Sequence, residues 1–162
     1  GCQNPVNGPY YNFTIPQSTG IVGIIAPESP SLLGLVTMIA APLCTGCTVV
    51  AIASDAAPLP AVLLGEICAT SDVPGGTVNL LTGTRNELLG PMGEHREIGA
   101  VAAANLSAGH REAIQVAAAD NLKRVHLIKQ TDVQWEDDER VASQWNLEPF
   151  VDFKTIWHPS AS

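Results

Sequence analysis

Short apolar runs alternate with longer ones along most of the chain. The short runs are rich in β-branched or small residues and are bounded by glycine, proline or charge, which predicts strands at 20–25, 48–53, 77–83, 98–104 and 123–128. The longer runs between them predict helices at 32–43, 54–69, 86–92 and 107–119. Strands that are apolar on both faces and alternate with helices predict an α/β fold. We expect a Rossmann-like, mostly parallel five-stranded sheet with helices on both faces.

Polar residues before two of these helices predict where the helices begin. Ser29 or Ser31 is placed to cap the first helix, and Ser54 or Asp55 is placed to cap the second. The segment 32–43 is apolar all round, which predicts a helix that is buried on every side.

The pattern changes near the end of the chain, where an acidic, polar stretch precedes a short alternating segment. Apolar and polar residues alternate over 150–157, which predicts a C-terminal pairing strand. A terminal strand alone is marginal, so it must add to a distant edge, either the chain's own 12–17 segment or another polypeptide. Large side chains make this strand a candidate interface; they are Phe150, Phe153, Ile156 and Trp157. The alternative is that the C-terminal aromatic residues pack back on the domain's own helices.

These patterns predict four regions. They are an N-terminal extension with a bridging strand (1–19), the Rossmann-like domain (20–130), an acidic linker with at most one helical turn (131–149) and the C-terminal pairing strand with its tail (150–162).

Composition and charge narrow the class of protein. The 162 residues are 46% hydrophobic and 15% charged, which predicts a globular chain with a real core rather than a disordered one. A net charge of −8 without basic clusters argues against nucleic acid or an anionic membrane as a partner. The apolar stretches are too short to span a membrane, and the first residues lack the pattern of a signal peptide. The four cysteines do not form a disulfide framework, so we expect a reduced, cytoplasmic protein.

The sequence gives only weak evidence for a redox, metal or phosphate-binding site. The Cys44–Cys47 pair has the C-x-x-C spacing of redox and zinc sites, but it closes a predicted helix and has no second ligand pair, which favours a packing and turn role. The four histidines are scattered, so no metal site is expected, and His126 is expected to be a strand histidine whose hydrogen bonds are satisfied within the fold. The glycine pattern of 83–90 lacks the lysine of a P-loop and is typical of a strand-to-helix turn.

Five stretches in order resemble the cofactor-binding half of the aldehyde dehydrogenase superfamily. They are IIAPESPSLLG, TGCTVVAIASD, VPGGTVNLLTG, AAANLSAGH and NLKRVHLIKQT. They are similar to that family's Pro-Trp-Asn-Phe-Pro turn and its AGNTVVLKPSE, PPGVVNVVTG, FTGSTEVG and NLKRVTLELGG motifs. The resemblance covers roughly 14–127, and FKTIW is similar to the C-terminal strand with which such enzymes pair subunits.

The resemblance implies that catalytic positions are degenerate. Ser29 stands where the family has the asparagine that donates to the oxyanion, and the neighbouring Glu28 would repel a developing negative charge. Ile128 stands at the general-base glutamate and has no proton chemistry, while Gln130 and Thr131 replace paired glycines. The catalytic domain with its nucleophilic cysteine has no counterpart in the sequence.

The resemblance implies the same for the cofactor-binding positions. Ile52 stands at the lysine that holds the adenosine ribose and cannot donate a hydrogen bond, although Asp55 roughly keeps an acidic position. Asn105 replaces a glycine that allows close approach to the nicotinamide side, and Leu106 would fill ligand space.

Degeneracy of this kind is most like the C-terminal pseudo-domain of the aldehyde dehydrogenase 16 family. The resemblance implies a chain that is not itself an enzyme, with no cofactor, in a protein-contact or oligomerisation role. Its expected partner is the catalytic domain of its own protein or a second subunit. The alternative is a residual NAD-binding module of an aldehyde dehydrogenase, which oxidises an aldehyde to an acid, with another domain supplying the catalytic cysteine. Whether a longer parent is active stays open.

Overall fold

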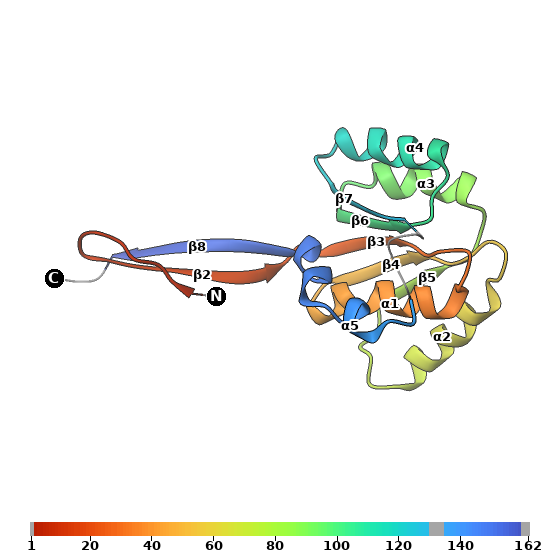
Figure 1. Cartoon of the computed structure of the whole chain (residues 1–162), viewed down its shortest axis with the longest axis horizontal. Coiled ribbons are helices and arrows are strands. Elements are labelled where there is room, and N and C mark those ends of the chain that lie inside the picture. Colours follow the sequence, from red (N-terminus) through yellow and green to blue (C-terminus); the bar gives the residue numbers. More distant parts are fainter. Residues whose placement is uncertain (1, 130–134, 160–162) are drawn as a thin grey trace.

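Five parallel strands form the central sheet of the computed structural model, which describes residues 2–129 and 135–159 (Figure 1). The strands are β3 (Ile21–Ile25), β4 (Thr48–Ile52), β5 (Val78–Leu81), β6 (Ile98–Ala104) and β7 (Arg124–Ile128). Their order in the sheet is β5-β4-β3-β6-β7, and every neighbouring pair is parallel. The predicted five-stranded parallel sheet is therefore confirmed, and the strand order reverses direction between β3 and β6.

Two helices cover each face of the sheet (Figure 1). The helices α1 (Ser31–Cys44) and α2 (Leu59–Thr70) lie on one face, and α3 (Arg85–Glu94) and α4 (Ala108–Ala119) lie on the other. All four lie where the sequence predicts helices. In both faces the side chains of the strands pack against the helices, and this gives two buried clusters.

The predicted helix caps are wrong for α1 and α2. Pro30 precedes α1 and Pro58 precedes α2, and neither helix has a side-chain cap. Ser54 and Asp55 instead form hydrogen bonds with residues from other parts of the chain. Ser54 Oγ also accepts from the backbone N–H of Ala57 at 3.1 Å, but this local turn lies before the helix, which begins at Leu59.

The prediction that the first helix is buried on every side is also wrong. Leu32, Leu33 and Val36 of α1 are each at least 40% exposed, whereas Leu35 is fully buried. On its buried side α1 approaches the turn after β3 so closely that a Cβ at Gly34 would clash with the ring of Pro27. Only glycine allows this contact.

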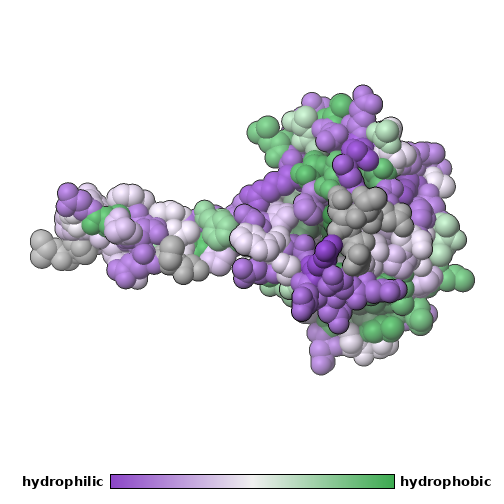
Figure 2. Space-filling view, viewed as in Figure 1, coloured by the Kyte–Doolittle hydropathy of each residue, from purple (hydrophilic) through white to green (hydrophobic). Residues whose placement is uncertain are grey.

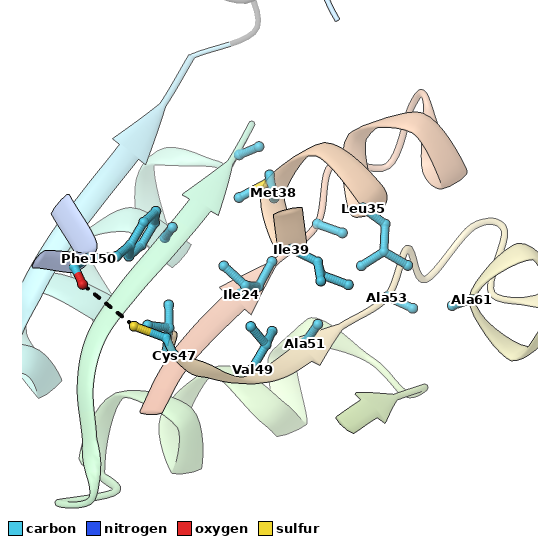
Figure 3. Close-up of a cluster of buried hydrophobic side chains, with 14 of the residues drawn as sticks. Ile24, Leu35, Met38, Ile39, Cys47, Val49, Ala51, Ala53, Ala61 and Phe150 are labelled. Atoms are coloured by element: carbon cyan, nitrogen blue, oxygen red, sulfur yellow. Dashed lines mark hydrogen bonds between the residues drawn. The ribbon is translucent and has the colours of Figure 1, made fainter. Parts of the chain in front are cut away.

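The C-terminal segment packs against the α1 face before it leaves the domain. It contains α5 (Asp138–Val141) and two short 3-10 helices, η2 (Gln144–Asn146) and η3 (Glu148–Phe150). Trp135 and Phe150 are buried in the same cluster as Met38 and Val49 (Figure 3). This part of the predicted linker therefore covers the sheet, and it has more structure than one helical turn.

A separate antiparallel ribbon, which we call the arm, projects from the sheet (Figure 1). It consists of β1 (Cys2–Gln3), β2 (Tyr10–Ser18) and β8 (Val151–Pro159), in the order β1-β2-β8. The predicted terminal strand therefore exists, and it pairs with the chain's own N-terminal segment. Arg124 of β7 holds the base of the arm, because its guanidinium contacts the Asp152 carboxylate and donates to the Val151 carbonyl at 3.0 Å.

The described residues include no helix with the length and apolar character needed to cross a membrane.

Candidate functional site at the carboxyl edge of the sheet

The carboxyl ends of β3, β4 and β6 meet at one edge of the sheet. In open α/β sheets, ligands bind outside this edge, where the strand order reverses. The turns that follow these strands therefore form the candidate site. The residues that the family resemblance singles out fall on the same turns and at the neighbouring end of β7.

Arg85 joins two of these turns. Its guanidinium Nη2 lies 2.9 Å from Glu28 Oε1 and donates to the carbonyl of Ala26 at 2.5 Å. The side chain of Arg85 is only 8% exposed. The first residue of α3 thus reaches across the carboxyl edge of the sheet and binds the turn after β3.

Glu28 is the centre of this network. Its Oε2 accepts hydrogen bonds from Ser54 Oγ at 2.6 Å and from the backbone N–H of Ala56 at 3.1 Å. Burial of the Glu28 carboxyl by itself raises its pKa, but the hydrogen bonds from Ser54 and Ala56 and the charge of Arg85 outweigh burial, so the pKa lies below its ordinary value. Glu28 is therefore ionised at neutral pH and holds a fixed negative charge in the turn.

Asp55 completes the network from the other side. Its Oδ2 accepts a hydrogen bond from the backbone N–H of Arg85 at 2.9 Å, which ties the end of β4 to the start of α3. The predicted acidic position is thus used within the protein. Ser29 lies in the same turn as Glu28 and is exposed, with no side-chain hydrogen bond among the described residues.

Apolar side chains occupy the rest of this edge. Ile52, the last residue of β4, is fully buried, and Leu106 is 8% exposed in the same cluster. Ile114 of α4 packs with both of them. Neither Ile52 nor Leu106 offers a group that could hold a ribose or a phosphate.

A shallow hollow remains between the ends of β6 and β7. Asn105, Leu106 and Ile128 line it together with the cations Arg111 and Lys129. Asn105 has a φ of 57°, a left-handed conformation that asparagine tolerates better than most residues. Its buried Oδ1 has no hydrogen-bond partner among the described residues. Gln130 and Thr131 lie outside the described residues.

The sequence reasoning missed Arg85 as a site residue. It treated 83–90 only as a strand-to-helix turn. The positions of the two residues in the sequence could have indicated the contact. Glu28 follows β3 and Arg85 follows β5, and both strands end at the same edge of a parallel sheet. A basic and an acidic residue at the carboxyl ends of nearby strands are expected to lie close together.

The other residues that the sequence offers for redox or metal chemistry lie in separate parts of the fold. Cys47 is buried and its Sγ lies 3.5 Å from the carbonyl of Phe150, whereas Cys44 is exposed (Figure 3). The described residues contain no group of three or more His, Cys, Asp or Glu that could hold a metal ion. The half-buried ring of His126 forms no hydrogen bond with another described residue, and the expectation of a satisfied histidine stays a prediction.

The four expected interface residues differ in exposure. Phe153, Ile156 and Trp157 lie on β8 and are 66%, 38% and 60% exposed. Phe150 lies one residue before the strand, in η3, and is only 4% exposed. It is therefore a core residue of this chain, because η3 turns its ring onto the α1 face of the sheet.

The sequence and the fold both match known proteins. The sequence model of the aldehyde dehydrogenase family matches residues 3–128. The chain is 33% identical over 150 residues to aminoaldehyde dehydrogenase 2 of Pisum sativum, and the match covers 88% of this chain and 30% of that protein. It is 32% identical over 129 residues to aminoaldehyde dehydrogenase 2 of Zea mays, covering 77% of this chain and 25% of that protein.

Solved structures of aldehyde dehydrogenases are also similar to this chain. The NAD⁺ complex of an aldehyde dehydrogenase from Bacillus cereus is similar with a TM-score of 0.75 and 28% sequence identity. This match covers 80% of the chain and 26% of the solved structure. The chain thus spans between a quarter and a third of the curated relatives named above. Over the greater part of its length, it belongs to the aldehyde dehydrogenase family.

Proposed function

We propose that this chain is a non-catalytic aldehyde dehydrogenase-like domain that serves protein–protein contact or oligomerisation within a larger protein. It is most like the degenerate C-terminal pseudo-domain of the aldehyde dehydrogenase 16 family. Its partner is the catalytic domain of its own protein or a second subunit. The observation that carries this proposal is the arm, and the filled carboxyl edge of the sheet supports it.

The arm exposes large apolar side chains on both of its faces. Antiparallel pairing places Tyr11, Phe13 and Ile156 on one face, and Tyr10, Phe153 and Trp157 on the other. The rings of Tyr10 and Trp157 meet edge to face with their centroids 6.0 Å apart. Figure 2 shows apolar patches along this projecting ribbon. A narrow ribbon of this kind that exposes aromatic rings on both faces is expected to be covered by a partner.

The outer edge of the arm is also open. Among the described strands, β8 pairs with β2 alone, so its second edge keeps unpaired backbone N–H and C=O groups. Another strand can add to such an edge, with the flanking side chains giving specificity. The partner's strand would then lie beside Phe153 and Trp157.

The carboxyl edge of the sheet supports the non-catalytic part of the proposal. The Arg85–Glu28 pair joins the turns there, Ile52 and Leu106 are packed in the core, and Ile128 offers no proton-transfer group. A residual NAD-binding module is the alternative, and it requires room and donors at this edge.

Substitution on the arm tests the proposal. The double variant Phe153→Ser with Trp157→Ser should reduce assembly, measured by sedimentation velocity of the chain alone and of the chain mixed with the remainder of its parent protein. Trp145→Ser is the matched control, because Trp145 is 71% exposed but lies outside the arm. Unchanged assembly in the double variant would reject the proposed role of the arm.

A further inference from the structure

A cavity of about 120 Å³ lies between the α1 face of the sheet and the C-terminal segment that covers it. Met38 and Ala41 of α1 form one wall, Ala102 and His126 of the sheet form another, and Trp135 and Phe150 close it. Figure 3 shows Met38 and Phe150 on the same side of the sheet, within the cluster around Ile24 and Val49. The cavity is separate from the carboxyl-edge turns that carry Glu28 and Arg85.

Trp135 and His126 both line this cavity, and neither forms a side-chain hydrogen bond with another described residue. Trp135 is 8% exposed, and its buried indole Nε1–H has no acceptor among the described residues. The imidazole of His126, which also lines the cavity, has no hydrogen-bond partner there either. An unpaired buried donor costs free energy, so a ligand that supplies an acceptor would bind with an advantage.

Two of the remaining polar residues of the wall are engaged within the chain, whereas the hydroxyl of Thr37, which also lines the cavity, has no hydrogen bond among the described residues. The amide of Asn146 donates to the carbonyls of Arg140 and Val141 at 2.8 and 2.9 Å. The guanidinium of Arg140 pairs with Asp137 at 3.2 Å and is 64% exposed, so the cavity reaches solvent beside this side chain. The inner part therefore offers a mostly apolar surface with the free donor of Trp135, the hydroxyl of Thr37 and the imidazole of His126.

These features indicate what kind of molecule the cavity can bind. The cavity volume corresponds to about four waters at ~30 Å³ each, and most of its wall is apolar, which favours an occupant with an apolar frame. A somewhat larger apolar cavity of roughly 150 Å³ in another protein accepts a benzene-sized molecule. Burial lowers the pKa of His126, which keeps its ring uncharged at neutral pH and disfavours a charged site.

We propose that this cavity binds a small uncharged molecule with an apolar frame and one hydrogen-bond acceptor, such as a small ketone or ether, and that Trp135 Nε1 donates to the acceptor. The site is independent of the arm and of the proposed protein-contact role.

Tryptophan indole resonances provide a direct test. The chain has three tryptophans, and the ¹⁵N-labelled protein should give three indole N–H signals, of which the Trp135→Phe variant removes one and so assigns it. Cyclopentanone is the probe, and methylenecyclopentane is its matched control, with the same shape and no oxygen acceptor. Cyclopentanone should shift the Trp135 signal saturably with roughly millimolar affinity, the range open to about six non-hydrogen atoms.

The exposed Trp145 and Trp157 serve as internal controls and should not shift. Methylenecyclopentane should bind about five- to tenfold more weakly, which is the expected effect of losing one hydrogen bond. Equal shifts of all three signals, or no saturable shift of the Trp135 signal, would overturn the proposal.

A second pair of variants tests the location. Ala41→Phe places a ring in the cavity and should abolish the cyclopentanone response, whereas Ala40→Phe adds the same ring at an exposed neighbouring position and should leave it unchanged. The two-dimensional amide spectrum establishes that each variant is folded. If folded Ala41→Phe binds cyclopentanone as the unmodified chain does, the cavity is not the site.

Discussion

Arg85 Nη2 lies 2.9 Å from Glu28 Oε1, and this ion pair joins the turn after β3 to the start of α3. Each partner has a second role, because Arg85 also donates to the carbonyl of Ala26 and Glu28 also accepts from Ser54. In a nucleotide-binding α/β domain the equivalent edge is where a ligand sits. Here the protein's own side chains connect the turns.

Loss of the Arg85 side chain should destabilise the fold. Arg85→Met removes the guanidinium that pairs with Glu28 and satisfies the Ala26 carbonyl. We expect a loss of about 2 kcal/mol in the free energy of unfolding, which is less than for a fully buried pair because solvent partly screens Glu28. Urea denaturation with a fixed m-value measures the loss.

Arg140→Met is the matched control for that measurement. Arg140 pairs with Asp137 at the surface, and its side chain is 64% exposed. Its replacement should cost less than about 1 kcal/mol. Equal losses in the two variants would contradict a special structural role for Arg85.

Glu28 should make stability depend on pH in the acid range. Its folded-state pKa lies below the ordinary value of 4.5, so the ionised carboxylate stabilises the fold fully above about pH 4.5. This contribution is lost as the pH falls through the folded-state pKa. The stability difference between the unmodified chain and Glu28→Gln should therefore be largest near neutral pH and shrink as the pH falls below 4.5. Urea titrations at several pH values would contradict this if the two curves stayed parallel.

His126 should also make stability depend on pH, in a higher pH range than Glu28. Burial lowers its pKa from 6.5 in the folded state, so folding favours the neutral ring. The resulting contribution to stability is fully present above about pH 6.5 and is lost as the pH falls through the pKa of His126 in the folded state. His126→Gln should flatten the stability curve where the pH falls below 6.5, whereas the contribution of Glu28 is lost only below 4.5.

The sheet was predictable from sequence because its signals are local. Runs such as 48–53 combine β-branched residues with flanking turn residues, and they form strands within one or two residues of the expected bounds. The helix 107–119 was also predictable, since Ser107 caps it by accepting from the backbone N–H of His110 at 3.2 Å.

The remaining features depend on contacts between distant residues. Ser54 is a reasonable cap by sequence, and its hydroxyl does accept from the Ala57 N–H, but it also donates to Glu28, 26 residues away, and the helix begins only at Leu59. Phe150 and Phe153 both fall within the strand that the sequence predicts, but Phe150 lies in a 3-10 helix and is buried, whereas Phe153 is exposed on the arm. The periodicity of apolar residues along the chain does not predict these hydrogen bonds and burials, because they depend on which distant residues come into contact in the folded state.

Nicotinamide cofactors should leave the stability of this chain unchanged. Ile52 has no donor for a ribose, Leu106 is packed in the core, and Arg85 is engaged with Glu28 at the edge where a dinucleotide would lie. Thermal unfolding in millimolar NAD⁺ or NADH measures this, because a cofactor at about 100 times its dissociation constant adds about 2.7 kcal/mol to a folded protein that binds it. The aldehyde dehydrogenase from Bacillus cereus, whose structure contains NAD⁺, is the positive control and should be stabilised. A saturable stabilisation of this chain, abolished by Asn105→Leu at the hollow between β6 and β7, would instead favour the residual cofactor-binding module.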